Sequence, residues 1–240
     1  MLSSSSTVSR VTPPRCACAT ATRVTAARAV LDGVNGDDIA DVIIDAVARV
    51  KAANPSAIYA CDPVMGNAKS GCFVADTIPP LLRDKVVPVA DLITPNQFEL
   101  GYLTERDVVD LDSTLAAVDA AREMGPSTVL VTSVKRPETP EDAIEMIAVD
   151  DHGKWIVRTP RLPFKRNGSG DVTAALFTGH YLRGLADNPA DAAKDALAKT
   201  ASSVYDLLRV TYEADSQELT LVEAQDYYAN PQLQFTVEAL

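Results

Sequence analysis

The chain has 240 residues, of which 47% are hydrophobic and 23% charged, an ordinary globular balance that excludes collagen, coiled coils and wholly disordered chains. Its 33 acidic and 22 basic side chains give a formal net charge of −11, which disfavours nucleic acid and anionic membranes as partners. No apolar run approaches the roughly 20 residues that cross a bilayer, so we expect no membrane span.

Cysteines and histidines are too few and too scattered for a disulfide scaffold or a zinc site. Cys16 and Cys18 form a lone C-x-C pair, and Cys61 and Cys72 stand far from any partner pair. This spacing does not match the ligand patterns of zinc sites. A reduced compartment fits these cysteines best, and we predict a cytoplasmic protein.

The first 36 residues differ from the rest of the chain. Residues 1–31 contain four arginines, no aspartate or glutamate, and many serines, threonines and alanines. That composition is typical of an organellar transit peptide. Because Pro13 and Pro14 interrupt any amphipathic stripe, we favour a disordered or wrongly assigned N-terminus over a targeting segment.

From residue 37 onward, predicted helices and strands alternate. Apolar residues at helical spacing predict a helix from Asp37 to about Asn54. The apolar run Ala57–Cys61, ended by Asp62 and Pro63, predicts a buried strand. The same signals predict further helices over residues 76–83 and 113–124, and strands over 91–94 and 128–133.

The second half of the chain combines a hairpin with helices. Two strand-like runs, 144–149 and 155–158, flank a turn at residues 151–153. Helical stretches follow at about 171–184, 189–209 and 216–228. With no repeat and no linker, the pattern predicts one α/β domain over residues 37–240, with a central, mostly parallel sheet flanked by helices.

The segment Asn167-Gly168-Ser169-Gly170-Asp171 leads directly into a predicted helix. Small residues at this place leave the first helical N–H groups accessible, and the helix dipole adds to them, so the loop suits a phosphate. The same residues also suit a plain N-cap with a tight glycine turn. The loop is not a dinucleotide fingerprint, because Thr173 stands where that motif has glycine.

Polar side chains follow two predicted strands. Asp62 ends the first in the segment D-P-V-M-G, and Asn96 and Glu99 follow the next in T-P-N-Q-F-E. The carboxyl ends of strands in α/β sheets form the ligand crevice. Asp62 and Glu99 therefore suit Mg²⁺ bound through water beside phosphate oxygens, while capping of a turn and first-turn helix chemistry stay open as alternatives.

Together, the D-P-V-M-G, T-P-N-x-x-E and G-x-G-D segments resemble those of the pyridoxal kinases of the ribokinase-like superfamily, in the same order and at similar separations. The resemblance covers roughly residues 37–240 and implies a ribokinase-like fold. It also implies phosphorylation of the 5′-hydroxyl of pyridoxal by ATP with Mg²⁺, forming pyridoxal 5′-phosphate in vitamin B6 salvage. Members of the family are typically homodimers.

The resemblance implies a role for each matching residue. Asp171 would contact the substrate hydroxyl as general base, and the backbone of Gly168, Ser169 and Gly170 would form the anion hole. Asp62 and Glu99 would serve the metal. The positions implied in ATP binding are Asp62, Thr94, Glu99, Thr132, Arg166 and Asn167.

Two alternatives remain open. Hydroxymethylpyrimidine kinases share the first two segments, but their anion-hole loop typically ends in cysteine where this chain has Asp171. At the front, nothing upstream of residues 32–36 resembles the family, which suggests a domain incomplete at its N-terminal side, through a start-site or frame error or a true truncation. A non-catalytic or weakly catalytic nucleotide-binding remnant is therefore the second class of function.

Overall fold

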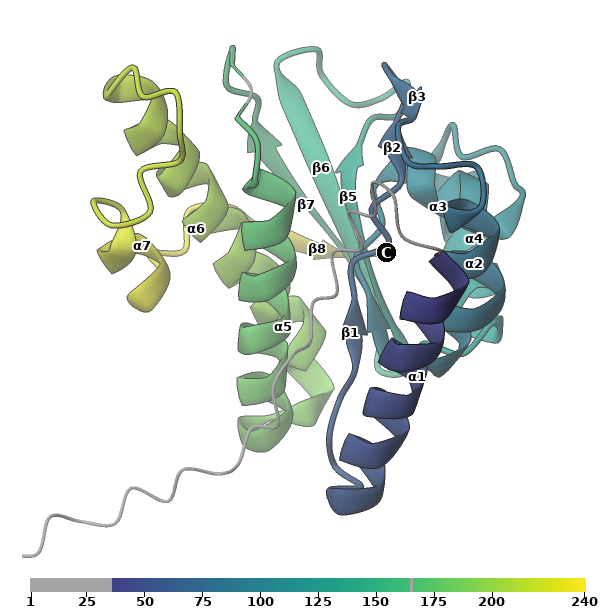
Figure 1. Ribbon diagram of the computed structural model, residues 1–240. Helices are drawn as coiled ribbons and strands as arrows, with labels where there is room; N and C mark the ends of the chain where they lie inside the picture. The colour runs from purple at the N-terminus through teal and green to yellow at the C-terminus, as the bar shows by residue number, and fades with distance from the viewer. Residues whose placement is uncertain (1–35, 165) are drawn as a thin grey trace, which may run out of the picture.

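The computed structural model describes residues 36–164 and 166–240, and the predictions made for residues 1–35 lie outside it. Its domain has three layers, with a six-stranded sheet between two groups of helices (Figure 1). Helices α1 (Gly36–Ala53), α3 (Gln97–Thr104) and α4 (Leu111–Glu123) cover one face of the sheet, and α5 (Ser169–Asp187) and α6 (Ala192–Glu213) cover the other. The predicted α/β architecture is confirmed.

The strands that precede α3 are short. Strands β1 (Ala60–Cys61) and β4 (Leu92–Ile93) each have two residues, fewer than the sequence predicts. Proline follows both strands within two residues and cannot donate to a ladder, so the regular ladder is interrupted there. The other elements of this half are β2 (Gly66–Asn67), β3 (Gly71–Cys72), α2 (Ile78–Leu81), a π-helical turn (Leu82–Val86) and a 3-10 turn (Val87–Val89).

The second half contains the predicted hairpin and one wrong prediction. Strands β5 (Thr128–Val134), β6 (Ala143–Val149) and β7 (Lys154–Pro160) have seven residues each. The helix predicted over 216–228 is wrong for most of its length, because only α7 (Gln225–Ala229) is α-helical. Ser216 Oγ donates to the carbonyl of Glu218 at 2.6 Å, a local bond that competes with helix formation. Strand β8 (Val237–Ala239), which the sequence analysis does not predict, completes the sheet.

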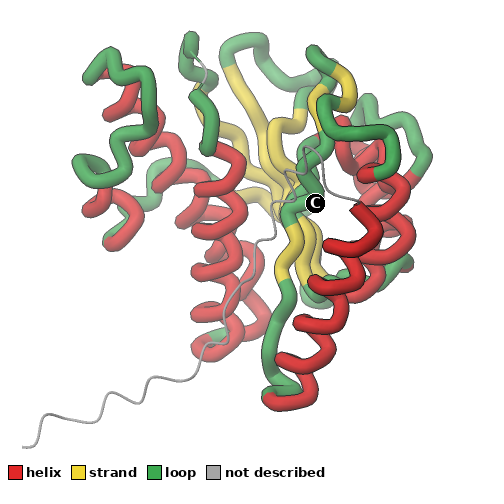
Figure 2. The backbone as a smooth tube through the Cα atoms, viewed as in Figure 1, coloured by secondary structure: helices red, strands yellow, loops and turns green. Residues whose placement is uncertain are grey.

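The strand order is β1-β4-β5-β6-β7-β8. The pairs β1–β4 and β4–β5 are parallel, and the pairs from β5 to β8 are antiparallel. Helix α5 begins at the end of the sheet where β1 ends and where the loops after β5 and β7 gather (Figures 1 and 2). This end of the sheet brings the three sequence segments of interest to one side of the molecule.

Two apolar clusters fill the space on either side of the sheet. Along β5, Val129 and Val131 face the cluster under α1 to α4, and Leu130 faces the cluster under α5 and α6. All three side chains have 0% exposure. Burying an aliphatic side chain of this size stabilises a fold by about 1.5–3 kcal/mol, so β5 anchors both layers. Within residues 36–164 and 166–240, no helix combines the length and apolar character that a membrane span requires.

Candidate active site

The glycine loop forms the N-terminus of α5. Gly168 is the N-cap residue with a φ of +87°, which a residue with a side chain rarely adopts, and the N–H of Val172 donates to its carbonyl at 3.0 Å. Asp171 lies exposed on the first turn. The first N–H groups of a helix have no carbonyl within the helix to donate to. This loop therefore presents N–H donors and a carboxylate together. It can bind an anion and accept a proton next to it.

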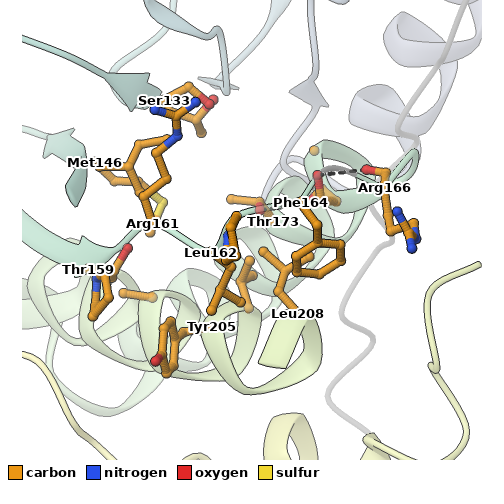
Figure 3. A pocket seen from close by; sticks show the side chains of 18 of the residues that line it. Ser133, Met146, Thr159, Arg161, Leu162, Phe164, Arg166, Thr173, Tyr205 and Leu208 are labelled. Atoms are coloured by element: carbon orange, nitrogen blue, oxygen red, sulfur yellow. Dashed lines mark hydrogen bonds between the residues drawn. The ribbon is translucent and has the colours of Figure 1, made fainter. Parts of the chain in front are cut away.

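Contacts with the end of α6 hold this loop. The guanidinium of Arg166 donates through Nε to the carbonyl of Ser216 at 2.6 Å and lies 5.1 Å from the ring centroid of Phe164. The Phe164 ring in turn packs against Tyr212, with centroids 5.3 Å apart. Arg166 stands at the margin of the cavity in Figure 3. Its side chain therefore tethers the loop, and its predicted part in ATP binding stays a prediction.

A cavity of about 860 Å³ opens between the sheet and helices α5 and α6. Apolar side chains from the 161–164 segment and from α6 form much of its wall, among them Leu162, Tyr205 and Leu208 (Figure 3). Four residues predicted for the site line it: Thr132, Arg166, Ser169 and Gly170. An apolar slot that ends at a helix N-terminus has the chemistry to hold a flat base at one end and phosphates at the other.

Asp62, Thr94 and Glu99 form a separate group behind the carboxyl ends of β1 and β4. The hydroxyl of Thr94, only 4% exposed, donates to Asp62 Oδ1 at 3.0 Å. Asp62 is half-buried and close enough to Glu99 for its charge to raise the pKa of Glu99. The structure thus shows that Thr94 supports Asp62, and its predicted part in ATP binding stays a prediction.

The Glu99 carboxylate joins the two motif segments. It is 3% exposed, and Oε1 accepts from the N–H groups of Met65 at 3.0 Å and Gly66 at 3.3 Å. Oε2 accepts from the N–H of Asn96 at 2.8 Å, completing a capping box at the start of α3. Burial is the main reason that the pKa of Glu99 is raised to about 7. The structure shows the helix-cap alternative, and the metal role stays a prediction.

A second cavity, of about 1250 Å³, lies beside the first. Its wall includes Asn96 and Gln97 of the T-P-N-Q-F-E segment and the cationic residues Lys69 and Lys135. Ser133, Ile144 and Arg161 line both cavities. Asp62, Thr94, Glu99 and Asp171 are not among the lining residues described for either space. In the described part of the chain, no group of three or more His, Cys, Asp or Glu side chains is placed so that it could hold a metal ion directly.

Sequence reasoning missed the contribution of α6 to the cavity. Ala201, Val204, Tyr205 and Leu208 line it from one face of that helix. Their spacing of three and four residues is the sequence signal for a shared helix face. It could have shown that these residues lie together, although not what they face. No pattern in the sequence indicated a role for Gln97 or for Ser133, whose backbone is in the left-handed region.

Comparison with known proteins agrees with this geometry. A family model described as phosphomethylpyrimidine kinase matches residues 36–216. Pyridoxal kinase PdxY of Corynebacterium diphtheriae is 68% identical over 213 residues, which cover 88% of this chain and 73% of that protein. The PdxY of Leifsonia xyli is 69% identical over 210 residues, 87% of this chain and 72% of that protein.

A solved structure shows the same fold. Pyridoxal kinase from Leishmania donovani in complex with ADP and ginkgotoxin superposes with a TM-score of 0.73 at 24% identity, covering 85% of this chain and 70% of that chain. The predicted ribokinase-like fold is thereby confirmed. The chain belongs to the phosphomethylpyrimidine kinase family of the ribokinase-like superfamily and, within it, to the pyridoxal kinases.

Proposed function

We propose that this chain transfers the γ-phosphoryl group of ATP to the 5′-hydroxyl of pyridoxal, forming pyridoxal 5′-phosphate in vitamin B6 salvage. The observation that carries the proposal is 68% identity to a protein named pyridoxal kinase over 213 residues. The ADP in the complex of the Leishmania donovani enzyme supports a nucleotide as the second ligand. The cavity at the start of α5 provides the chemistry that such a nucleotide needs.

The nucleotide occupies the 860 Å³ cavity in this proposal. Its base lies in the apolar part between Leu162 and the α6 residues Tyr205 and Leu208. Its phosphates extend past Thr132 and Asn167 to the N–H groups at residues 168–170. Because charge grows on the transferred group and its neighbours, fixed N–H dipoles at this point lower the barrier by electrostatics and positioning.

Asp171 acts as the general base. Its carboxylate stands exposed on the first turn of α5, beside the N–H groups that receive the phosphoryl oxygens. The substrate hydroxyl gives up its proton as the oxygen attacks phosphorus, and a carboxylate at this place can accept it. Positioned proton acceptors of this kind contribute about 10²–10⁴ to a rate.

Asp62 and Glu99 are the two carboxylates that would serve a divalent cation in this proposal. The charge of Asp62 helps to raise the pKa of the buried Glu99, so two acidic groups lie close together where a cation would relieve their repulsion. Mg²⁺ held through water beside phosphate oxygens would neutralise charge on ATP. We expect Glu99→Gln to require more Mg²⁺ for half-maximal activity with an unchanged KM for pyridoxal. An unchanged Mg²⁺ titration with a raised KM would refute the metal role.

A second candidate substrate is a hydroxymethylpyrimidine, which the description of the matching family model favours. Asp171 argues against it, since that branch typically carries cysteine there. We further propose a homodimer, on the basis of the family resemblance, and a cytoplasmic location, on the basis of the few and scattered cysteines.

The test is an assay of the purified chain with ATP, Mg²⁺ and, in parallel, pyridoxal, pyridoxine, pyridoxamine or hydroxymethylpyrimidine. We expect pyridoxal 5′-phosphate to form, and Asp171→Asn to stop its formation. A matched control is Asp187→Asn, which removes an exposed carboxylate from the other end of the same helix. Nucleotide binding without transfer to any acceptor would support the remnant alternative, and preference for the pyrimidine would support the second candidate.

A further inference from the structure

A residue in the left-handed region forms part of the wall between the two cavities. Ser133 has a φ of +55° near the end of β5, where the pairing with β6 shifts register between Val131 and Val134. It lines both cavities and is exposed. Serine disfavours this backbone conformation, so contacts on either side of Ser133 must hold it.

The side chain of Gln97 supplies one of these contacts. Its Oε1 accepts from the N–H of Lys135 at 2.8 Å, and its Nε2 donates to the carbonyl of Lys135 at 3.1 Å. The amide thus bonds both polar groups of one residue, as a neighbouring strand would. On the other side of Ser133, the N–H of Thr132 donates to the carbonyl of Pro95 at 2.9 Å. The chain is fixed on both sides of the left-handed residue.

Gln97 is itself held rigidly. It is the first residue of α3, directly after the N-cap Asn96, and its Nε2 also donates to the carbonyl of Val108 at 2.7 Å. The capping box that starts this helix includes Glu99, which binds the D-P-V-M-G segment. The Gln97 amide therefore connects the backbone around Ser133 to the group that contains Asp62.

The loop after Lys135 has anchors of its own. Glu145, fully buried, accepts from Arg136 at 2.8 and 3.0 Å and from Arg158 at 2.7 and 3.0 Å. Thr139 donates to the same carboxylate at 2.8 Å. Loss of Gln97 should therefore release the backbone at Ser133 while the loop after Lys135 stays in place.

We propose that Gln97 is a positioning residue of the nucleotide site, which holds the left-handed backbone of Ser133 in the shape that binds ATP. The proposal rests on the proposed function in one respect, that ATP occupies the 860 Å³ cavity. Gln97 touches no reacting atom and acts through Lys135 and Ser133.

The test measures the dissociation constant of a non-hydrolysable ATP analogue by calorimetry. Gln97→Leu removes all three hydrogen bonds, and Gln97→Glu removes both donors while keeping the size of the side chain. We expect each to weaken binding by about tenfold, and the exposed control Gln225→Leu to leave it within about twofold. Dissociation constants within about twofold of the native value in folded Gln97→Glu would overturn the proposal.

A double-mutant cycle with Ser133→Gly distinguishes positioning from simple contact loss. Glycine adopts positive φ readily, so it should relieve the need for Gln97. We expect Ser133→Gly to be more favourable for binding in the Gln97→Leu background than in the native one, by about threefold or more. Additive effects would contradict the proposal. A native chain that binds the analogue but does not phosphorylate pyridoxal would refute the proposed function. The dissociation constants of the analogue would still decide whether Gln97 positions the nucleotide site.

Discussion

The parallel and antiparallel halves of the sheet contribute to the site in opposite ways. At the ends of β1 and β4, Thr94 and Glu99 are 4% and 3% exposed, and hydrogen bonds tie them to Asp62 and to the backbone. Beyond β5, the antiparallel strands and the helices α5 and α6 border an open cavity. Asp171 stands exposed on the first turn of α5. The polar group behind β1 and β4 is held by hydrogen bonds, and the carboxylate at the start of α5 is exposed.

The difference separates residues that hold the site in shape from the residue that takes part in the reaction. Substitution of a buried, hydrogen-bonded side chain is costly because its partner is left without a hydrogen bond. Substitutions in the group behind β1 and β4 should therefore alter stability as well as activity. An exposed carboxylate at a helix terminus can change without loss of packing. The first two predictions test this division most strongly.

The largest expected effect is at Asp171. Asp171→Asn should lower kcat by about 10²–10⁴, because the amide keeps the shape of the side chain but accepts no proton. The midpoint of thermal unfolding and the affinity for ATP should stay close to the native values. Steady-state kinetics and calorimetry provide the measurements, with Asp187→Asn as control. A variant that keeps a rate within about tenfold of the native one would show that Asp171 is not the base.

Glu99 should link stability to pH. Its pKa is raised from 4.5 to about 7 in the folded protein, mainly by burial. Between these values the folded state keeps a proton that the unfolded state has lost, so this group makes stability fall as pH rises through that window. The loss is at most about 3 kcal/mol.

Glu99→Gln should therefore flatten the pH dependence of the unfolding free energy between pH 5 and 7, roughly the window of the shift. Urea unfolding at several pH values measures it, and the exposed Glu223 offers the control Glu223→Gln. An equal slope in Glu99→Gln and the native chain would show that Glu99 does not titrate in this window.

A smaller effect is expected at Thr94. Thr94→Val keeps the shape of the side chain and removes the hydroxyl that donates to Asp62. Losing one hydrogen bond to a charged group costs about 1.5–3 kcal/mol, so we expect kcat/KM for ATP to fall about tenfold or more. Thr104→Val, which removes a hydroxyl bonded only to a helix carbonyl at 2.8 Å, should leave it nearly unchanged. Equal effects of the two substitutions would show that the hydroxyl of Thr94 has no specific role in the site.

The smallest expected effect is in the apolar wall of the cavity. Leu208→Ala removes three carbon atoms from the face of α6 and should weaken ATP binding by about three- to tenfold, with kcat nearly unchanged. Calorimetry measures it, and Leu221→Ala, at a leucine that is 43% exposed, is the control. A lowered kcat with unchanged affinity would place the base of the nucleotide elsewhere.

The sequence predicted local features better than long-range ones. Helix α1 and the β6–β7 hairpin follow from apolar spacing and turn residues, which depend only on neighbours along the chain. Strand β8 pairs with β7 from more than seventy residues away, as in the pair Trp155 and Ala239, and no local pattern encodes that pairing.

The same limit applied to the site. The three motif segments identified Asp62, Glu99 and Asp171, but spacing alone could not show that Glu99 is buried, Asp62 half-buried and Asp171 exposed. The hydroxyl of Thr94 received its partner only through the pairing of β4 with β1, and the amide of Gln97 only through the packing of α3 against β5. Hydrogen bonds between such distant segments depend on tertiary structure, which a motif does not contain.

The most direct test of the account is a crystal structure of the chain with a non-hydrolysable ATP analogue and pyridoxal. We predict that the base lies against Tyr205 and Leu208, the terminal phosphate at the N–H groups of residues 168–170, and the pyridoxal hydroxyl next to Asp171. A nucleotide bound in the second cavity, with its phosphates on Lys69 and Lys135, would contradict it.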